Sequence, residues 1–132
     1  MKPAVVALIA ALSLGAAQDE WKPIPLSRVE TAPDSTAEVG LVLTPAPGTI
    51  DVGLVVDNPC AAKLGATYQP HGAVVKLRLI GPPADRRCPG RRLEAYQAAV
   101  NGLRPKRYQV IVYTADAKGR WRPWKAGVTE VP

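Results

Sequence analysis

Residues 93–116, LEAYQAAVNGLRPKRYQVIVYTAD, contain two stretches in which apolar side chains occupy every second position. Such alternation is typical of β-strands with one buried face. Asn101 and Gly102 interrupt the first stretch, and Pro105 stiffens the connection to the second. We therefore predict a strand, a short corner and a second strand. The predicted buried positions are Tyr96, Ala98 and Val100 in the first strand and Tyr108, Val110 and Val112 in the second.

The corner resembles the E–F corner of fibronectin type III and related immunoglobulin-like sandwiches, through the pattern Gly102-Leu103-x-Pro105-x-x-Tyr108 followed by alternating valines. The resemblance covers about residues 38–131. It implies that Leu103 fills the core and that the Tyr108 hydroxyl bonds back to the corner backbone. The corner is one residue tighter than the commonest fibronectin spacing. Both cysteines lie in expected loops, whereas antibody domains bridge two strands across the core, so antibody-like recognition does not transfer.

Alternation also predicts strands at residues 38–44, 49–57 and 73–80, with loops at 60–72 and 81–92. A last strand is expected at 121–131, with regular pairing from Lys125 because Pro123 precedes it. A helical period does not run for three turns anywhere in the sequence. The fold class expected is all-β: an immunoglobulin-like (fibronectin type III-like) antiparallel β-sandwich of about seven strands.

The N-terminus, MKPAVVALIAALSLGAA, has the form of a secretory signal peptide, with one early lysine, an apolar run and small residues before residue 18. The alternative is an amphipathic or core helix, but the run lacks a polar face. We predict a signal peptide at 1–17, a Pro-rich extended arm or edge strand at 18–37, and the sandwich at 38–132. The mature protein is expected to be exported, periplasmic or extracellular, and without a membrane span.

Cys60 and Cys88 are the two cysteines of the chain. In an exported protein such a pair predicts a disulfide, the alternative being two free thiols. The loop it would close spans 28 residues, which stabilises the fold by about 3–4 kcal/mol on the chain-entropy estimate. The spacing fits no zinc pattern, so we expect no metal and no cofactor.

Positive charge is concentrated late in the chain. Residues 86–125 carry eleven Lys and Arg against two Asp and Glu, whereas residues 18–85 carry five against eight. In the implied sandwich the loops that hold the cysteines and the last hairpin loop meet at one end. The side chains expected to form a basic binding surface there are Arg86, Arg87, Arg91, Arg92, Arg120, Trp121, Arg122 and Trp124, with Lys118, Tyr68 and His71 as further candidates.

Guanidinium groups match carboxylate and phosphate groups, and indole rings stack on sugars, bases or cations. The alternative is that the charge only keeps the protein soluble. Trp121 and Trp124 resemble the Trp-x-x-Trp segment of cytokine-receptor fibronectin domains, which implies a structural ladder of Trp and Arg side chains as an alternative to ligand stacking. Exposed Ile111 and Tyr113 are expected either to meet a partner or to lie under the N-terminal arm and Trp21.

The sequence carries one histidine, His71, in an expected loop, and lacks nucleophile and phosphate-loop signatures. We therefore expect a non-catalytic binding module. The expected partner is an acidic protein or an acidic envelope polysaccharide, and nucleic acid is less favoured. The alternatives are an inhibitor of an exported protease and a structural domain of an envelope assembly.

Overall fold

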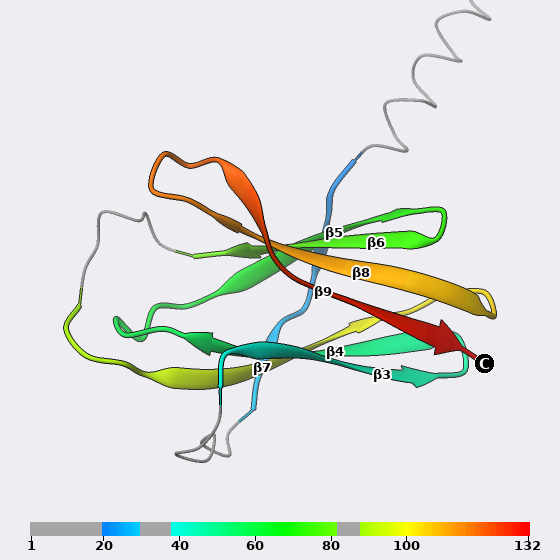
Figure 1. Ribbon diagram of the computed structural model, residues 1–132, viewed down its shortest axis with the longest axis horizontal. Helices are drawn as coiled ribbons and strands as arrows, with labels where there is room; N and C mark the ends of the chain where they lie inside the picture. Colours follow the sequence, from blue (N-terminus) through cyan, green and yellow to red (C-terminus); the bar gives the residue numbers. More distant parts are fainter. Residues whose placement is uncertain (1–19, 30–37, 82–87) are drawn as a thin grey trace, which may run out of the picture.

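The computed structural model describes residues 20–29, 38–81 and 88–132, which form nine β-strands and no helix (Figure 1). The predicted signal peptide, residues 30–37 of the predicted arm, and Arg86 and Arg87 lie outside the described residues. In the three described ranges no helical segment has the length and apolar character needed to cross a bilayer.

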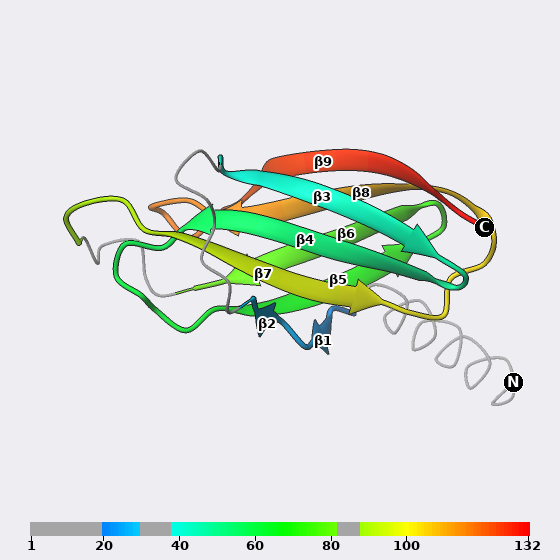
Figure 2. The same cartoon turned by 90° about the horizontal axis from the view of Figure 1, so that it is seen from below.

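The strands form two sheets that pack face to face (Figure 2). One sheet has five strands in the order β1-β5-β6-β8-β9, and the other has four in the order β2-β7-β4-β3. The fold is thus an all-β sandwich, as predicted, but with nine strands where about seven were expected. The strand bounds are β1 (Lys22–Ile24), β2 (Ser27–Arg28), β3 (Gly40–Ala46), β4 (Thr49–Asp57), β5 (Gly65–His71), β6 (Val74–Ile80), β7 (Leu93–Val100), β8 (Lys106–Ala115) and β9 (Trp121–Val131).

Three strands are additional to the six whose ranges were predicted: β1 and β2, which are short pieces of the arm, and β5. The sequence analysis assigned residues 60–72 to a loop, and this assignment was wrong for Gly65–His71. The stretch GATYQPH contains little apolar alternation and a proline, so the strand signal was weak. Pairing with β6 on one side and β1 on the other nevertheless holds it in the sheet.

One strand pair differs from a fully antiparallel sandwich. β6 and β8 run parallel, with Val75 beside Val110 and Leu77 beside Val112, whereas the other pairs are antiparallel. The last strand also differs from expectation, because β9 pairs with β8 from Trp121 onward. A register shift between Val112 and Tyr113 accommodates Pro123 within the ladder.

The core lies between the sheets and consists of the inward positions of the alternating strands. Ile50, Val52 and Leu54 of β4 face Val75 and Leu77 of β6 and Val110 and Val112 of β8, and all seven are at most 1% exposed. Each fully buried aliphatic side chain stabilises the fold by about 1.5–3 kcal/mol relative to leaving it in water. This core therefore fixes the position of the loops at both ends of the sandwich.

Each of the two edges of the sandwich, where one sheet meets the other, is covered. On one side β3 and β9 lie next to each other, and Gly127 of β9 is close enough to β3 that an added Cβ would lie 3.0 Å from Leu43 Cδ1. On the other side the N-terminal arm joins both sheets, since β1 pairs with β5 and β2 pairs with β7. Ile24 of the arm is buried in the core. The predicted arm is thus part of the sandwich at residues 22–28.

The corner between β7 and β8 has the expected geometry. The Tyr108 hydroxyl donates a hydrogen bond of 3.0 Å to the carbonyl of Arg104. Leu103 packs against the core, and its N–H donates to the carbonyl of Gly48 in the β3–β4 turn. Gly102 has a φ of 74°, a conformation that glycine adopts without the steric cost other residues meet. The corner therefore ties two connections together at one end of the sandwich.

Candidate binding pole

The loops at residues 58–64, 88–92 and 116–120 lie at one end of the sandwich, opposite the β7–β8 corner (Figures 1 and 2). We call this end, with the strand ends that flank it, the disulfide pole. Cys60 and Cys88 are bonded there, with their Cα atoms 5.2 Å apart. A backbone hydrogen bond from Asn58 N–H to the Arg92 carbonyl extends the β4–β7 ladder into the pole, and the Asp57 side chain adds a bond by accepting from Arg92 N–H at Oδ1.

A hollow with a volume of about 520 Å³ opens at the disulfide pole. Its walls come from both sheets, with Val39 and Val56 on one side and Leu79 and Ile80 on the other. Trp121 and Trp124 line it from β9, and Cys60 from the disulfide. Volumes of about 300–1,000 Å³ are usual for sites that hold small molecules. The hollow is thus large enough to accept an apolar group.

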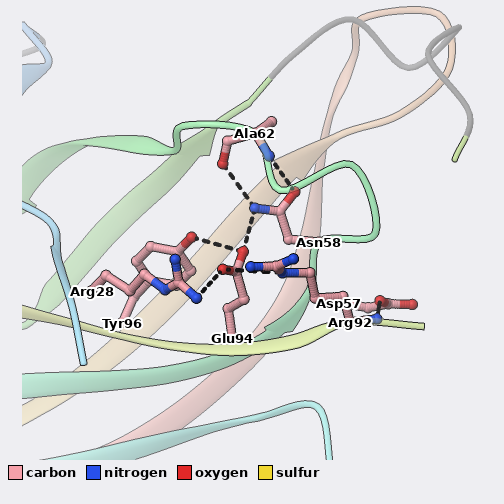
Figure 3. A network of polar contacts seen from close by, with 7 residues as sticks. All are labelled: Arg28, Asp57, Asn58, Ala62, Arg92, Glu94 and Tyr96. Carbon is pink, nitrogen blue, oxygen red and sulfur yellow. Dashed lines mark hydrogen bonds and ion pairs between the residues drawn. The ribbon is translucent and has the colours of Figure 1, made fainter. Parts of the chain in front are cut away.

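Glu94 is the centre of a buried polar network next to the hollow (Figure 3). Its side chain is 3% exposed. Oε1 accepts hydrogen bonds from Asn58 Nδ2 at 2.6 Å and from the Tyr96 hydroxyl at 3.2 Å. Oε2 lies 2.8 Å from a guanidinium nitrogen of Arg28 and 3.6 Å from Nε of Arg92. A carboxylate so surrounded is compensated in charge and in hydrogen bonds, as a buried anion must be.

The network joins three parts of the chain that are distant in sequence. Arg28 comes from the N-terminal arm, Glu94 and Tyr96 from β7, and Asn58 from the end of β4. Asn58 also donates to the Ala62 carbonyl at 2.8 Å and accepts from the Ala62 N–H at 3.2 Å, which fixes the loop before β5. Burial, together with the adjacent Glu94 charge, raises the pKa of the Tyr96 hydroxyl. Tyr96 is therefore the neutral donor of the network at neutral pH.

Asp116 organises the β8–β9 loop of the pole. Oδ1 accepts from the backbone N–H groups of Lys118 and Arg120, both at 2.9 Å. Oδ2 lies 3.4 Å from Nε of Arg120 and 3.3 Å from Nε of Arg122. The bond from the Arg120 backbone N–H, with those from Lys118 and Arg122, lowers the pKa of Asp116. Two exposed guanidinium groups thus share one carboxylate, so positive charge remains at the loop.

Trp121, which lines the hollow, also contacts the Arg78 guanidinium group. The Arg78 guanidinium lies 3.9 Å from the ring centroid of Trp21 and 4.8 Å from that of Trp121. Such contacts favour the cation electrostatically and hold both rings in place. Trp121 is therefore part of a stack of Trp and Arg side chains, but its other members are Arg78 and the arm residue Trp21, not Trp124 as the Trp-x-x-Trp segment implied. Trp124 packs against the core, with Lys125 Nζ 5.9 Å from its ring centroid.

The structure places six of the eight predicted binding residues at the disulfide pole: Arg91, Arg92, Arg120, Trp121, Arg122 and Trp124. Arg91, Arg92, Arg120 and Arg122 are exposed. His71 lies elsewhere, as the last residue of β5, paired with Val74 of β6 at the opposite end of that strand. Tyr68 lies along β5, beside Lys22 and Leu77.

Glu94 and Asn58 were not identified from the sequence. The sequence did indicate the position of Glu94. It lies an even number of residues from Tyr96, Ala98 and Val100 in the same strand, so its side chain faces inward with theirs. A charged residue at an inward position requires partners, which the sequence alone did not reveal. Within the described residues, no cluster of three or more His, Cys, Asp or Glu side chains could hold a metal ion.

Comparison of the chain with models of known protein families, with curated proteins and with solved structures finds no significant match.

Proposed function

We propose that the protein is an exported, non-catalytic binding module of the immunoglobulin-like or fibronectin type III-like kind, and that its disulfide pole binds an acidic partner. The observation that carries the proposal is the coincidence, at one end of a rigid sandwich, of a hollow, a disulfide and surplus positive charge. The acidic partner is a protein or an envelope polysaccharide.

The charge at the described part of the pole supports this proposal. The six exposed cations are Lys63, Arg91, Arg92, Lys118, Arg120 and Arg122, against the three carboxylates of Asp57, Glu94 and Asp116. Glu94 is buried and already compensated by Arg28 and Arg92. The field that an approaching molecule meets is therefore positive, and such a field increases the rate of encounter with acidic partners.

Rigidity of the pole also supports a binding role. The Cys60–Cys88 bond, the Asn58 bonds to Ala62 and the Asp116 bonds to its own loop each fix a loop backbone. A surface held in one arrangement loses less conformational entropy when a partner binds. The hydrogen bond from the Tyr108 hydroxyl to the Arg104 carbonyl supports the immunoglobulin-like part of the proposal.

The test measures retention of the protein, purified from the periplasm of a bacterial host, on acidic polymers and cell-envelope fractions over a salt series. The variant R91S/K118S removes two exposed cations from the disulfide pole. The control R104S/R107S removes two exposed cations from the opposite end, so the net charge of both variants is equal.

We expect retention that weakens with salt and that falls in R91S/K118S but much less in R104S/R107S. Equal retention of the two variants would contradict the proposal, because net charge alone would then explain binding. Salt-tolerant, stoichiometric inhibition of an exported protease would instead favour the inhibitor.

A further inference from the structure

We infer that the hollow at the disulfide pole takes a large apolar side chain from an acidic polypeptide segment, with the carboxylates of that segment held by the surrounding arginines. This inference rests on the proposed function and specifies its partner. It follows from the lining of the hollow, from the polar groups already engaged there and from the charge at its rim.

The lining of the hollow favours an apolar group. Val39, Val56, Leu64, Leu79 and Ile80 contribute aliphatic surface. Ile80 is 44% exposed although it is large and apolar, so a partner group placed against it would remove apolar surface from water. A sugar hydroxyl placed on the same surface would lose its hydrogen bonds to water without gaining others.

Two of the polar residues that line the hollow already have partners within the protein. Asp57 accepts from the backbone of Arg92, and the Asn58 side chain is bonded to Glu94 and Ala62. The Asn58 amide is engaged at both its oxygen and its nitrogen, so it does not offer free groups to the hydroxyl groups of a polysaccharide. Trp121 is held against Arg78 as well, so it forms a fixed aromatic wall for the hollow.

The rim favours negative charge next to the apolar group. Arg91 is exposed in the loop before β7. Arg120 and Arg122 flank Trp121, which lines the hollow, and share the single carboxylate of Asp116. Guanidinium groups bind carboxylates through directed hydrogen bonds. Polypeptides combine carboxylates with a neighbouring large apolar side chain, whereas acidic polysaccharides lack such a side chain. An acidic peptide segment therefore matches both parts of the site.

The experiment titrates the purified protein with three probes and follows tryptophan fluorescence and calorimetric heat. The first probe is a peptide of Asp and Glu with one central Phe, the second has Ala in place of Phe, and the third is polygalacturonate. The Phe peptide contains no tryptophan, so a fluorescence change reports on the protein. The variant I80S alters the wall of the hollow, and V128S is its control, because Val128 is 55% exposed on β9 and outside the hollow.

We expect the Phe peptide to bind about tenfold more tightly than the Ala peptide, as for a side chain anchored in a partner's pocket. This difference should largely disappear in I80S and persist in V128S. Thermal unfolding of both variants checks that they are folded.

Equal affinity of the Phe and Ala peptides, or a Phe preference that I80S leaves unchanged, would overturn the inference. If polygalacturonate binds more tightly than the Phe peptide and R91S/K118S weakens it, the inference fails while the proposed function stands. If R91S/K118S changes the binding of none of the three probes, both fail.

Discussion

Replacement of Glu94 by alanine should be among the most destabilising single changes in the chain. The substitution removes the acceptor of two buried hydrogen bonds, from Asn58 and Tyr96, and the ion pair with Arg28. A hydrogen bond to a charged group contributes about 1.5–3 kcal/mol. The Arg28 side chain is 55% exposed, so its pairing adds about 1 kcal/mol or less. After partial relaxation we expect a loss of about 3–5 kcal/mol in the free energy of unfolding.

The assay is urea unfolding of the oxidised protein, followed by tryptophan fluorescence, with the free energy taken from linear extrapolation. E94Q keeps the size of the side chain and one carbonyl acceptor but presents an amide donor to the arginines, and should cost about 1–2 kcal/mol. E130Q is the matched control, because Glu130 is exposed on β9, and should change stability by about 0.5 kcal/mol or less.

The reasoning is refuted if E94A costs less than about 1 kcal/mol, or if E94Q stabilises the protein. Either result would show that the desolvation of the carboxylate outweighs its interactions. An unchanged m-value across the variants is required for the comparison, since a changed m-value would indicate a different unfolded or native state.

Three further predictions concern the Glu94 network, the contact between β3 and β9, and the disulfide. Burial raises the pKa of the Tyr96 hydroxyl. The contribution of this hydroxyl to stability is therefore complete below its pKa in the unfolded chain, about 10, and is lost as the pH rises through its pKa in the folded protein. Absorbance titration at alkaline pH should show a late-ionising tyrosine that Y96F removes. G127A should lower the free energy of unfolding by about 1–2 kcal/mol, measured by thermal unfolding, because the new methyl would lie 3.0 Å from a leucine methyl of β3. The control G65A, with no atom within 4 Å of its new Cβ, should leave the stability nearly unchanged. C60S/C88S should lower the free energy of unfolding in urea by about 3–4 kcal/mol; a loss below about 1 kcal/mol would contradict the loop-closure argument.

The sequence was sufficient for those strands whose apolar residues alternate. β9 has the predicted bounds but pairs with β8 from Trp121 and not from Lys125. β4 and β7 have the predicted bounds, and the corner residues Leu103 and Tyr108 make the contacts that the resemblance implied. These features depend on local pattern, since a strand with one buried face shows its burial in its own residues. The Cys60–Cys88 bond was likewise readable from the cysteine count.

Features that depend on partners far along the chain could not be predicted. β5 lacks its own pattern and is held by its neighbours, and the parallel contact of β6 with β8 is a property of the whole sheet. The compensation of Glu94 needs Arg28, which lies 66 residues earlier in the sequence. The hollow requires both sheets, so its apolar walls appear only when the strands are packed.

The closure of one side of the sandwich by the N-terminal arm has a consequence for the order of folding. Lys22 pairs with Tyr68 and Ser27 with Gln97, so the arm can dock only after β5 and β7 have reached their places. Contacts of such large sequence separation form slowly. Until the arm docks, its backbone N–H and C=O groups are unpaired and can pair with a strand of another unfolded chain. Pro23 and Pro25 lack the backbone N–H group that pairing with a strand of another chain requires, so they protect the undocked arm against aggregation.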